Sequence, residues 1–315
     1  MAFDHRFVEP DNIDIVTSDN FELVVRRLGA EAIGLTWKHP AHGDIGVLWR
    51  NGCLDDPSQF WKSHAPILFP IVGGIHELKS ATTDGAPIWF KKQHGFVRHS
   101  QVRLGGAMDY GDHFALTYRL RANKETLAMY PWRFALTIIY ELWADKLVQR
   151  LTVSNEDTKP MPFQLGWHPG FAAPLVAGEK AACHLRLPGE TITQLLNDDR
   201  CYLTGESKQI EARGDFAFTE TELDRTYMFD LSALPPEQRA VELLDPDEKV
   251  GVRLRFADYP HLGLWSDAGA PFICLEAWQG MDDAVEQEPF DKKFGMVMLP
   301  PGKNDTREAT IEPIG

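Results

Sequence analysis

Two side chains in this sequence, His168 and Glu276, have surroundings that suit proton transfer. His168 lies in the segment Gln164-Leu-Gly-Trp-His-Pro-Gly-Phe171, directly before a proline and just after a run that is typical of a strand. Proline restricts its own backbone and favours extended geometry in the residue before it, so the segment predicts a histidine at a rigid bend. Such a histidine is either a proton donor or a core residue bonded to a backbone carbonyl.

Glu276 is a carboxylate in the otherwise apolar segment Phe272-Ile-Cys-Leu-Glu-Ala-Trp-Gln279. Because side chains alternate along a strand, this segment places two sets of residues on opposite faces: Ile273, Leu275 and Ala277 on one, and Cys274, Glu276 and Trp278 on the other. Burying a lone carboxylate is costly, so Glu276 is either part of a structural ion pair or a functional group. The neighbouring tryptophan favours a sugar ligand, because pyranose faces stack on aromatic rings while the hydroxyls need polar partners.

A third polar segment, Gln93-His-Gly-Phe-Val-Arg98, offers two side-chain donors, His94 and Arg98, beside a glycine that permits close backbone approach. Both a ligand-binding segment and an ordinary surface loop fit this pattern.

The sequence shows no clear pattern for metal binding, for a serine nucleophile or for a nucleotide cofactor. Among the eleven histidines, His39 and His42 are separated by a proline, and His94 and His99 have no obvious third ligand, so we predict no metal site. The sequence has no GxSxG nucleophile elbow, no GxGxxG after a strand and no Walker-type phosphate loop. Serine hydrolysis and dinucleotide chemistry therefore lack support, and no cofactor is expected.

Charge and composition exclude several partners. The chain has 46 acidic and 32 basic side chains, a formal net charge of -14 and no cluster of basic residues, so nucleic acid and anionic membranes are not expected as partners. The start of the sequence lacks the apolar core of a signal peptide, and no stretch approaches eighteen apolar residues. The four cysteines, Cys53, Cys183, Cys201 and Cys274, have no CxxC spacing and are predicted to be reduced in a cytoplasmic protein.

The elements that would position these residues are mainly strands. The clearest are 114–121 and a hairpin of 134–142 and 147–153, in which apolar and polar side chains alternate. Further short strands are predicted at 21–25, 32–36, 47–49, 183–187, 202–203, 250–256, 262–265 and 272–278. We also predict a short helix in Asp55–Trp61, an extended connector or sheet edge at Pro66–Val72, and an extended run from Met161 to His168.

The spacing of turn residues bears on domain organisation. No segment keeps a helical period for more than about three turns, and the 21 prolines and 25 glycines are spread along the chain without forming a linker. These features favour one large all-β antiparallel domain over residues 1–315, with few short helices.

Five segments together resemble the aldose 1-epimerase family in order and approximate spacing, and most closely its galactose-mutarotase-like, LacX-like branch. They are Pro66–Gly73, His94–Arg98, Tyr130–Phe134, Gly166–Phe171 and Ile273–Trp278. The resemblance extends over about residues 20–300. It implies a large antiparallel β-sandwich, the galactose mutarotase-like supersandwich, with a sugar-binding cleft on one sheet and no cofactor.

The resemblance also implies roles for individual residues in anomer interconversion of a free hexose such as galactose or glucose. Glu276 would take the proton from the anomeric hydroxyl while His168 protonates the ring oxygen, so that the ring opens, the aldehyde end rotates and the ring closes as the other anomer. His94 would contact a sugar hydroxyl with support from Arg98, and Asp224 would correspond to an acidic sugar ligand. A Glu/His pair suits this chemistry near neutral pH if its surroundings keep the glutamate ionised and the histidine protonated.

Two other functions fit the same residues. A hexose-6-phosphate mutarotase would need at least two convergent basic side chains, of which Arg98 is one candidate. A non-catalytic carbohydrate-binding or sugar-sensing protein of the same fold would need neither His168 nor Glu276.

The sequence departs from the family pattern at Gly73-Gly74, where a basic residue is expected after the first glycine, and this departure bears on sugar recognition.

Overall fold

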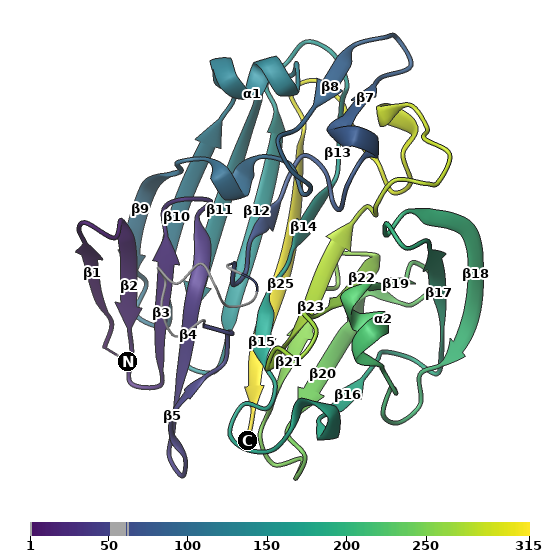
Figure 1. Ribbon diagram of the computed structural model, residues 1–315. Helices are drawn as coiled ribbons and strands as arrows, with labels where there is room; N and C mark the ends of the chain where they lie inside the picture. The colour runs from purple at the N-terminus through teal and green to yellow at the C-terminus, as the bar shows by residue number, and fades with distance from the viewer. Residues whose placement is uncertain (1, 51–60, 62) are drawn as a thin grey trace.

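The computed structural model describes residues 2–50, 61 and 63–315, and it consists mainly of antiparallel strands (Figure 1). Within these residues the only α-helices, α1 (Lys124–Met129) and α2 (Glu220–Asp224), are short. The prediction of an all-β antiparallel sandwich with few short helices is confirmed.

The strands form two large sheets, one smaller sheet and two strand pairs. The first large sheet has the order β16 (His184–Arg186), β20 (Ala240–Leu244), β21 (Gly251–Arg255), β25 (Asn304–Ile314), β12 (Leu147–Asn155), β11 (Phe134–Leu142), β10 (Phe114–Arg121) and β9 (Arg103–Asp109). The second has the order β18 (Leu203–Glu211), β17 (Thr191–Asn197), β19 (Tyr227–Asp230), β22 (His261–Trp265), β23 (Phe272–Gln279), β14 (Leu165–Trp167) and β6 (Ile67–Leu68), with β15 (Gly170–Ala172) paired to β23.

The smaller sheet lies at the N-terminal side of the molecule (Figure 1). It contains β1 (Asp4–Val8), β2 (Ile13–Thr17), β3 (Phe21–Arg26), β4 (Glu31–His39) and β5 (Gly43–Gly46). The strand pairs are β7 (Lys79–Ala81) with β8 (Pro87–Trp89), and β13 (Met161–Phe163) with β24 (Val297–Leu299). Single 3-10 turns occur at His76–Leu78, Val97–His99, Lys180–Ala182, Pro236–Gln238 and Phe290–Lys292.

The hairpin of β11 and β12 shows how alternation in the sequence builds a sheet. Every second side chain of β11 is buried, beginning at Phe134 and ending at Leu142. Leu142 lies opposite Leu147 of β12, so the chain reverses at the predicted turn. The predicted hairpin is confirmed, and β12 continues past Val153 to Asn155.

The two large sheets pack against each other across one hydrophobic core. Aromatic rings from both sides meet there: the ring centroid of Tyr140 in β11 lies 6.5 Å from that of Trp167 in β14. The ring of Phe134 in β11 lies 5.0 Å from that of Phe69, which follows β6. Removal of such large apolar surfaces from water is the main driving force for this packing.

Strand β23 lies inside the second sheet, between β22 and β14, and both of its faces are buried. The side chains that point into the main core are Ile273, Leu275 and Ala277. On the opposite face, Trp278 belongs to a small apolar cluster with Leu68 and Met281, and Cys274 belongs to another with Trp61 and Trp265. Glu276 lies between Cys274 and Trp278 on that second face, as the alternation predicts.

One predicted strand is shorter than expected, one predicted connector is found, and one predicted helix lies outside the described residues. The strand predicted at 47–49 is reduced to an isolated bridge between Leu48 and Phe171. The Pro66–Val72 connector is buried throughout and contains the edge strand β6, so both predicted features occur together. The short helix predicted in Asp55–Trp61 lies outside the described residues, apart from Trp61 itself.

Gly95 permits the close backbone approach that the sequence predicts. Its φ is +74°, and a Cβ atom added there would lie 2.1 Å from the carbonyl oxygen of Phe69. We expect Gly95→Ala to lower the free energy of unfolding by about 4 kcal/mol or more, because a left-handed backbone and a main-chain overlap both oppose a side chain. Chemical denaturation measures this loss.

Gly85 provides the matched control for this substitution. Its φ is +86°, but nothing lies within 4 Å of the position that a Cβ would take. Gly85→Ala should therefore cost only the backbone term of about 1–2 kcal/mol. Equal losses for the two variants would show that the contact with Phe69 is not what requires a glycine at position 95.

Candidate active site

His168 and Glu276 are far apart in the sequence but meet on the outer face of the second sheet. The Nε2 atom of His168 lies 3.1 Å from Oε2 of Glu276, and the two side chains are 7% and 1% exposed. The contact follows from strand pairing, because Trp167 at the end of β14 lies opposite Ala277 of β23. The structure thus brings together the two residues that the sequence singles out for proton transfer.

The bend that carries His168 is fixed by main-chain contacts. The backbone N–H of His168 donates to the carbonyl of Pro66 at 3.1 Å, and the indole N–H of Trp167 donates to the carbonyl of Ala65 at 3.1 Å. After Pro169 the chain pairs with β23 again through β15. The imidazole is therefore mounted on backbone that is held on both sides.

Glu31 anchors the segment that holds this bend. One of its carboxylate oxygens accepts hydrogen bonds from the backbone N–H groups of His64 at 2.7 Å and Ala65 at 3.3 Å, and the other faces Arg26 at 2.5 Å. Burial opposes the charge of Glu31, but the contacts with His64 and the charge of Arg26 prevail and lower its pKa to about 2. This buried carboxylate is therefore ionised at neutral pH and positions the chain beneath the site.

We expect Glu31→Gln to remove much of the acid sensitivity of the fold. Because the folded-state pKa of about 2 lies below the ordinary value of 4.5, the carboxylate stabilises the protein above about pH 4.5, and this contribution is lost as the pH falls toward 2. At neutral pH the variant should be less stable by roughly 3 kcal/mol, and the difference should shrink in acid. Urea unfolding at both pH values measures the difference. The exposed Glu125, replaced by Gln, is the control, and a pH-independent difference for Glu31→Gln would contradict this role.

His94 stands beside His168 with its ring edge-on, at a centroid distance of 5.4 Å. Its Nδ1 accepts a hydrogen bond from the backbone N–H of Gly73 at 3.0 Å, so the neutral ring carries its proton on Nε2. Burial, together with the charges of Arg98 and Lys293, lowers the pKa of His94 to about 3. The Nε2–H group makes no hydrogen bond within the described residues, which leaves it free for a ligand oxygen.

Arg98 lies in the 3-10 turn after His94 and is half-buried. Its Nη2 donates to the hydroxyl of Ser63 at 2.9 Å. Its positive charge opposes the rise in the pKa of Glu276 and contributes to the low pKa of His94. Arg98 thus acts on the site through its charge.

Burial sets the protonation of the central pair. It raises the pKa of Glu276 well above its ordinary value, although the hydrogen bond from Trp278 and the charge of Arg98 act in the opposite direction. Burial also lowers the pKa of His168 well below its ordinary value, with further contributions from the charges of His94 and Arg98. Both shifts disfavour the ionised pair that the sequence-based mechanism starts from. The free protein therefore favours a neutral carboxyl beside a neutral imidazole, with one proton between them.

Two aromatic side chains that were not predicted as site residues lie against His168. The ring of Trp61 stacks on His168 at 4.7 Å, and the ring of Trp265 lies edge-on at 5.9 Å. The indole N–H of Trp278 donates to Oε2 of Glu276 at 3.1 Å. Trp265 ends a predicted strand, but only the pairing of β22 with β23 brings it to His168. These rings provide flat apolar surfaces of the kind on which sugars stack.

Asp282 is a second buried carboxyl group next to the site. It accepts a hydrogen bond from the backbone N–H of Gly74 at 2.6 Å, and a Cβ on Gly73 would lie 2.2 Å from its carboxyl carbon. Burial raises the pKa of Asp282 to about 6, against the opposing charge of Lys293. The glycine pair that departs from the family pattern is thus packed against an acid.

Asp224 lies at the end of α2 and is exposed. Its backbone carbonyl accepts a hydrogen bond from the indole N–H of Trp265 at 3.2 Å. Its carboxylate makes no hydrogen bond or ion pair within the described part of the chain. Asp224 therefore reaches the site only through Trp265, and its role as a sugar ligand stays a prediction.

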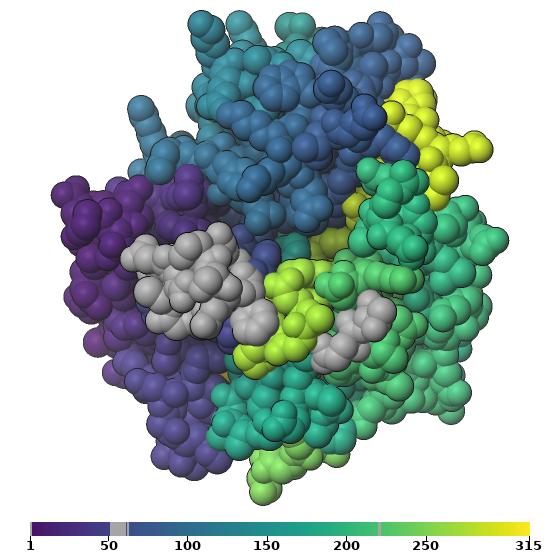
Figure 2. Space-filling view, viewed as in Figure 1, coloured from purple at the N-terminus to yellow at the C-terminus, as the bar shows by residue number. Residues whose placement is uncertain are grey.

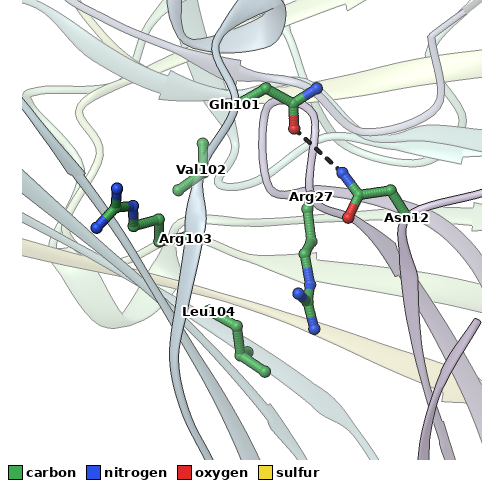
Figure 3. A pocket seen from close by; sticks show the side chains of 6 residues that line it. All are labelled: Asn12, Arg27, Gln101, Val102, Arg103 and Leu104. Carbon is green, nitrogen blue, oxygen red and sulfur yellow. Dashed lines mark hydrogen bonds between the residues drawn. The ribbon is translucent and has the colours of Figure 1, made fainter. Parts of the chain in front are cut away.

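A separate cavity of about 530 Å³ lies between the small sheet and β9 (Figure 3). It is lined by Asn12, Arg27, Gln101, Val102, Arg103 and Leu104. Arg27 is already paired with Asp14 through hydrogen bonds of 2.8 and 2.9 Å, and Asn12 donates to Gln101. None of the predicted site residues lines this cavity.

The candidate site lies where distant parts of the chain converge. Figure 2 shows the face on which segments of the N-terminal half and of the C-terminal third meet around a recessed centre.

Neither α-helix of the described residues has the length and apolar character needed to span a membrane. The predicted cytoplasmic location stays a prediction.

Comparison with known proteins identifies the family and the fold. The sequence model of the aldose 1-epimerase family matches residues 14–311. Over 241 residues the chain is 30% identical to the plasmid form of protein LacX from Lactococcus lactis subsp. lactis, covering 74% of this chain and 78% of that protein. The fold is similar to that of a galactose mutarotase related enzyme from Lactobacillus acidophilus, with a TM-score of 0.85 and 24% identity over 96% of this chain and 97% of that chain. It is also similar to a galactose mutarotase-like protein from Lactobacillus casei, with a TM-score of 0.81 and 26% identity over 96% of this chain and 99% of that chain.

The fold is thus a galactose mutarotase-like sandwich with a buried histidine–glutamate pair on one sheet. The chain belongs to the aldose 1-epimerase family. The family resemblance drawn from five sequence segments is confirmed.

Proposed function

We propose that this protein is a mutarotase that interconverts the α and β anomers of a free aldose such as galactose or glucose. The observation that carries the proposal is the 3.1 Å contact between His168 and Glu276. Mutarotation exchanges protons at the anomeric hydroxyl and at the ring oxygen, and both of these oxygens are bonded to the same carbon. The acid and the base must therefore lie close together, as these two side chains do.

Ring opening in this proposal uses both groups at once. Glu276 takes the proton of the anomeric hydroxyl as the carbonyl double bond forms, the bond from the anomeric carbon to the ring oxygen breaks, and His168 delivers a proton to that oxygen. The C1–C2 bond then rotates, and closure on the other face reverses both transfers. Each transfer returns a proton to the group that lost one, so the pair regains its starting state.

The protonation of His168 and Glu276 in the free protein matches the half of the cycle in which the sugar is open. A carboxyl beside a neutral imidazole is the arrangement that exists while the sugar is open, and burial favours this arrangement. Closed-ring binding requires the same single proton to lie on His168. The indole N–H of Trp278 and the charge of Arg98 stabilise the carboxylate of Glu276 in that state.

The charges around the pair favour an uncharged sugar over a sugar phosphate. Arg98 is one cation near the site, and the buried Lys293 donates to the carbonyl of Met281 and lies 3.8 Å from the carboxylate of Asp283. Asp282 adds a further acidic group at the turn where a basic residue is expected. Among the described residues, a phosphate would therefore meet carboxylates, and Lys293 is already paired with one of them.

The test compares free α-glucose and α-galactose with α-glucose 6-phosphate in a polarimetric assay, with binding followed by tryptophan fluorescence because Trp61 stacks on His168. We expect kcat/KM to be at least about tenfold higher for a free sugar, a difference of about 1.4 kcal/mol. A higher value for the phosphate ester would favour a hexose-6-phosphate mutarotase. Binding of sugar without any rate enhancement would favour the non-catalytic sugar-binding alternative.

The pH dependence of kcat/KM follows from the shifts of the central pair. Activity requires one proton on the pair, so it should fall in acid where His168 gains a second proton and in alkali where Glu276 loses its proton. Burial lowers the first pKa and raises the second, which moves both limbs away from neutrality. We expect a broad plateau across neutral pH, measured as initial rates corrected for buffer catalysis. An acid limb at the ordinary histidine value of about 6.5 would contradict the assignment.

A further inference from the structure

A third side chain with metal-binding chemistry lies beside the candidate acid–base pair. Cys274 and Glu276 are on the same face of β23, and their ligand atoms and that of His168 all lie within 4.8 Å of one another. Thiolate sulfur, imidazole nitrogen and carboxylate oxygen are the three ligand types that Zn²⁺ takes in proteins. Tetrahedral coordination of one ion requires these atoms to move closer to one another.

The thiol of Cys274 has no hydrogen-bond partner in the described part of the chain. The residue is fully buried, and its sulfur makes no hydrogen bond within the described residues. A Cβ added to Gly170, two residues after His168, would lie 3.3 Å from that sulfur, so the thiol packs against the bend that carries the histidine. Cys274 is therefore aimed into the site without a structural hydrogen bond to hold it.

The charge balance of the three groups suits a divalent cation in an apolar setting. A thiolate and a carboxylate supply two negative charges, and an imidazole supplies a neutral nitrogen. Together with a divalent ion they form a complex with no net charge, which avoids the cost of burying an isolated charge. The side chains of Trp61, Trp265 and Phe272 pack with Cys274 and provide an apolar setting on that side.

We propose that His168, Cys274 and Glu276 form a binding site for a thiophilic divalent cation such as Zn²⁺ or Cd²⁺, and that the bound cation inhibits the enzyme. On binding, the S–H bond of Cys274 breaks, a metal–sulfur bond forms and the proton passes to solvent, together with the proton shared by the pair. No oxidation or reduction occurs. The ion then occupies the Nε2 lone pair and the carboxylate, so neither group can exchange a proton with a sugar.

The proposed cation site differs from the sequence-based prediction of no metal site. Histidine spacing in the sequence does not indicate this third ligand, because Cys274 and His168 are brought together only by the pairing of β15 and β23, in which Gly170 lies opposite Cys274. The cation binds here as an inhibitor. The binding part of the proposal stands on geometry, and the inhibition part rests on the proposed function.

Cd²⁺ titration of the whole chain tests the binding site directly. We expect a thiolate-to-cadmium charge-transfer band in the wild type, which Cys274→Ser abolishes. Zn²⁺ affinity, measured by competition with a chelating dye, should fall at least about tenfold in that variant, since loss of second-shell support alone costs 10–100-fold. An unchanged band and unchanged affinity in Cys274→Ser would overturn the site.

Two controls separate this site from surface binding. Cys201→Ser removes a less buried thiol that donates to the carbonyl of Arg225. His39→Ala disrupts a histidine pair whose rings are 4.7 Å apart on the surface. Both variants should keep the charge-transfer band and the Zn²⁺ affinity of the wild type. Loss of the band in Cys201→Ser would place the cation elsewhere and contradict the proposal.

Mutarotation assays separate inhibition by the cation from binding of the cation. Zn²⁺ should inhibit wild-type mutarotation, and a chelator should reverse the inhibition. When each rate is expressed relative to the same protein without Zn²⁺, Cys274→Ser should need at least about tenfold more Zn²⁺ for the same inhibition. Binding of Cd²⁺ at Cys274 without inhibition of an active enzyme would overturn the inhibition. A protein that binds Cd²⁺ at Cys274 but has no mutarotase activity would support the cation site and contradict the proposed function alone.

Discussion

Glu276→Gln is expected to lower the rate of mutarotation by about 10²–10⁴-fold, the usual size of a general-base contribution. Glutamine has nearly the same shape as glutamate and keeps an oxygen for the indole N–H of Trp278, which donates to Glu276 at 3.1 Å. It cannot take the proton of the anomeric hydroxyl. Because glutamine also removes the cost of a buried ionisable group, the fold should be retained.

Polarimetry of freshly dissolved α-galactose measures this loss, and circular dichroism checks the fold. The matched control is Glu125→Gln, in which an exposed glutamate of α1 loses its contact with Lys91 but the site is unaffected. The control should keep the wild-type rate. An unchanged rate in Glu276→Gln would remove this carboxylate from the mechanism.

His168→Gln is expected to lower the rate by a similar factor of about 10²–10⁴. The amide nitrogen of glutamine can take up the position of Nε2, which lies 3.1 Å from Glu276, but it does not deliver a proton to the ring oxygen. His99→Gln is the control, because His99 is exposed and follows Arg98 in the chain. A rate loss as large in His99→Gln would indicate that substitution of a histidine alone disturbs the fold.

The two substitutions together test whether the residues act as one unit. Groups that transfer protons in a single step are strongly non-additive, so the double variant should lose little more activity than either single variant. Rate losses that multiply in the double variant would show that His168 and Glu276 act independently, which their 3.1 Å contact argues against.

Alternation predicts those strands whose two faces have different environments. In β10 and β11, one face meets the core and the other meets polar surroundings, and both strands are found where the sequence places them. Strand β25 was not predicted, because its sequence Asn304–Ile314 is rich in polar residues. It is held instead by pairing with β12 on one side and β21 on the other, a tertiary effect that overrides local preference.

The sequence pattern also did not predict the short helix α1, for a local reason. It begins with a capping box in which the side chain of Asn123 accepts from the backbone N–H of Thr126 while the hydroxyl of Thr126 accepts from the backbone N–H of Asn123. The usual sequence signal has a glutamate or glutamine at the second position. A threonine there does not match that pattern, although it makes the same two hydrogen bonds.

Sequence reasoning identified the residues of the candidate site that have distinctive neighbours. His168 stands before a proline and Glu276 stands in an apolar strand, so each could be singled out within its own segment. Trp61 and Asp282 could not, because they reach the site only through the folded arrangement of the chain. The protonation of the pair was also not predictable, since it depends on how deeply the second sheet buries both groups.

The central claim, that the paired imidazole and carboxylate open the ring of a free aldose, is tested most directly with the wild-type protein. Optical rotation of freshly dissolved α-glucose and α-galactose is followed with increasing amounts of protein. We predict that at least one sugar reaches its anomeric equilibrium faster than in buffer, at a rate proportional to protein concentration. A folded protein that leaves the buffer rate unchanged for a full panel of aldoses would contradict the claim.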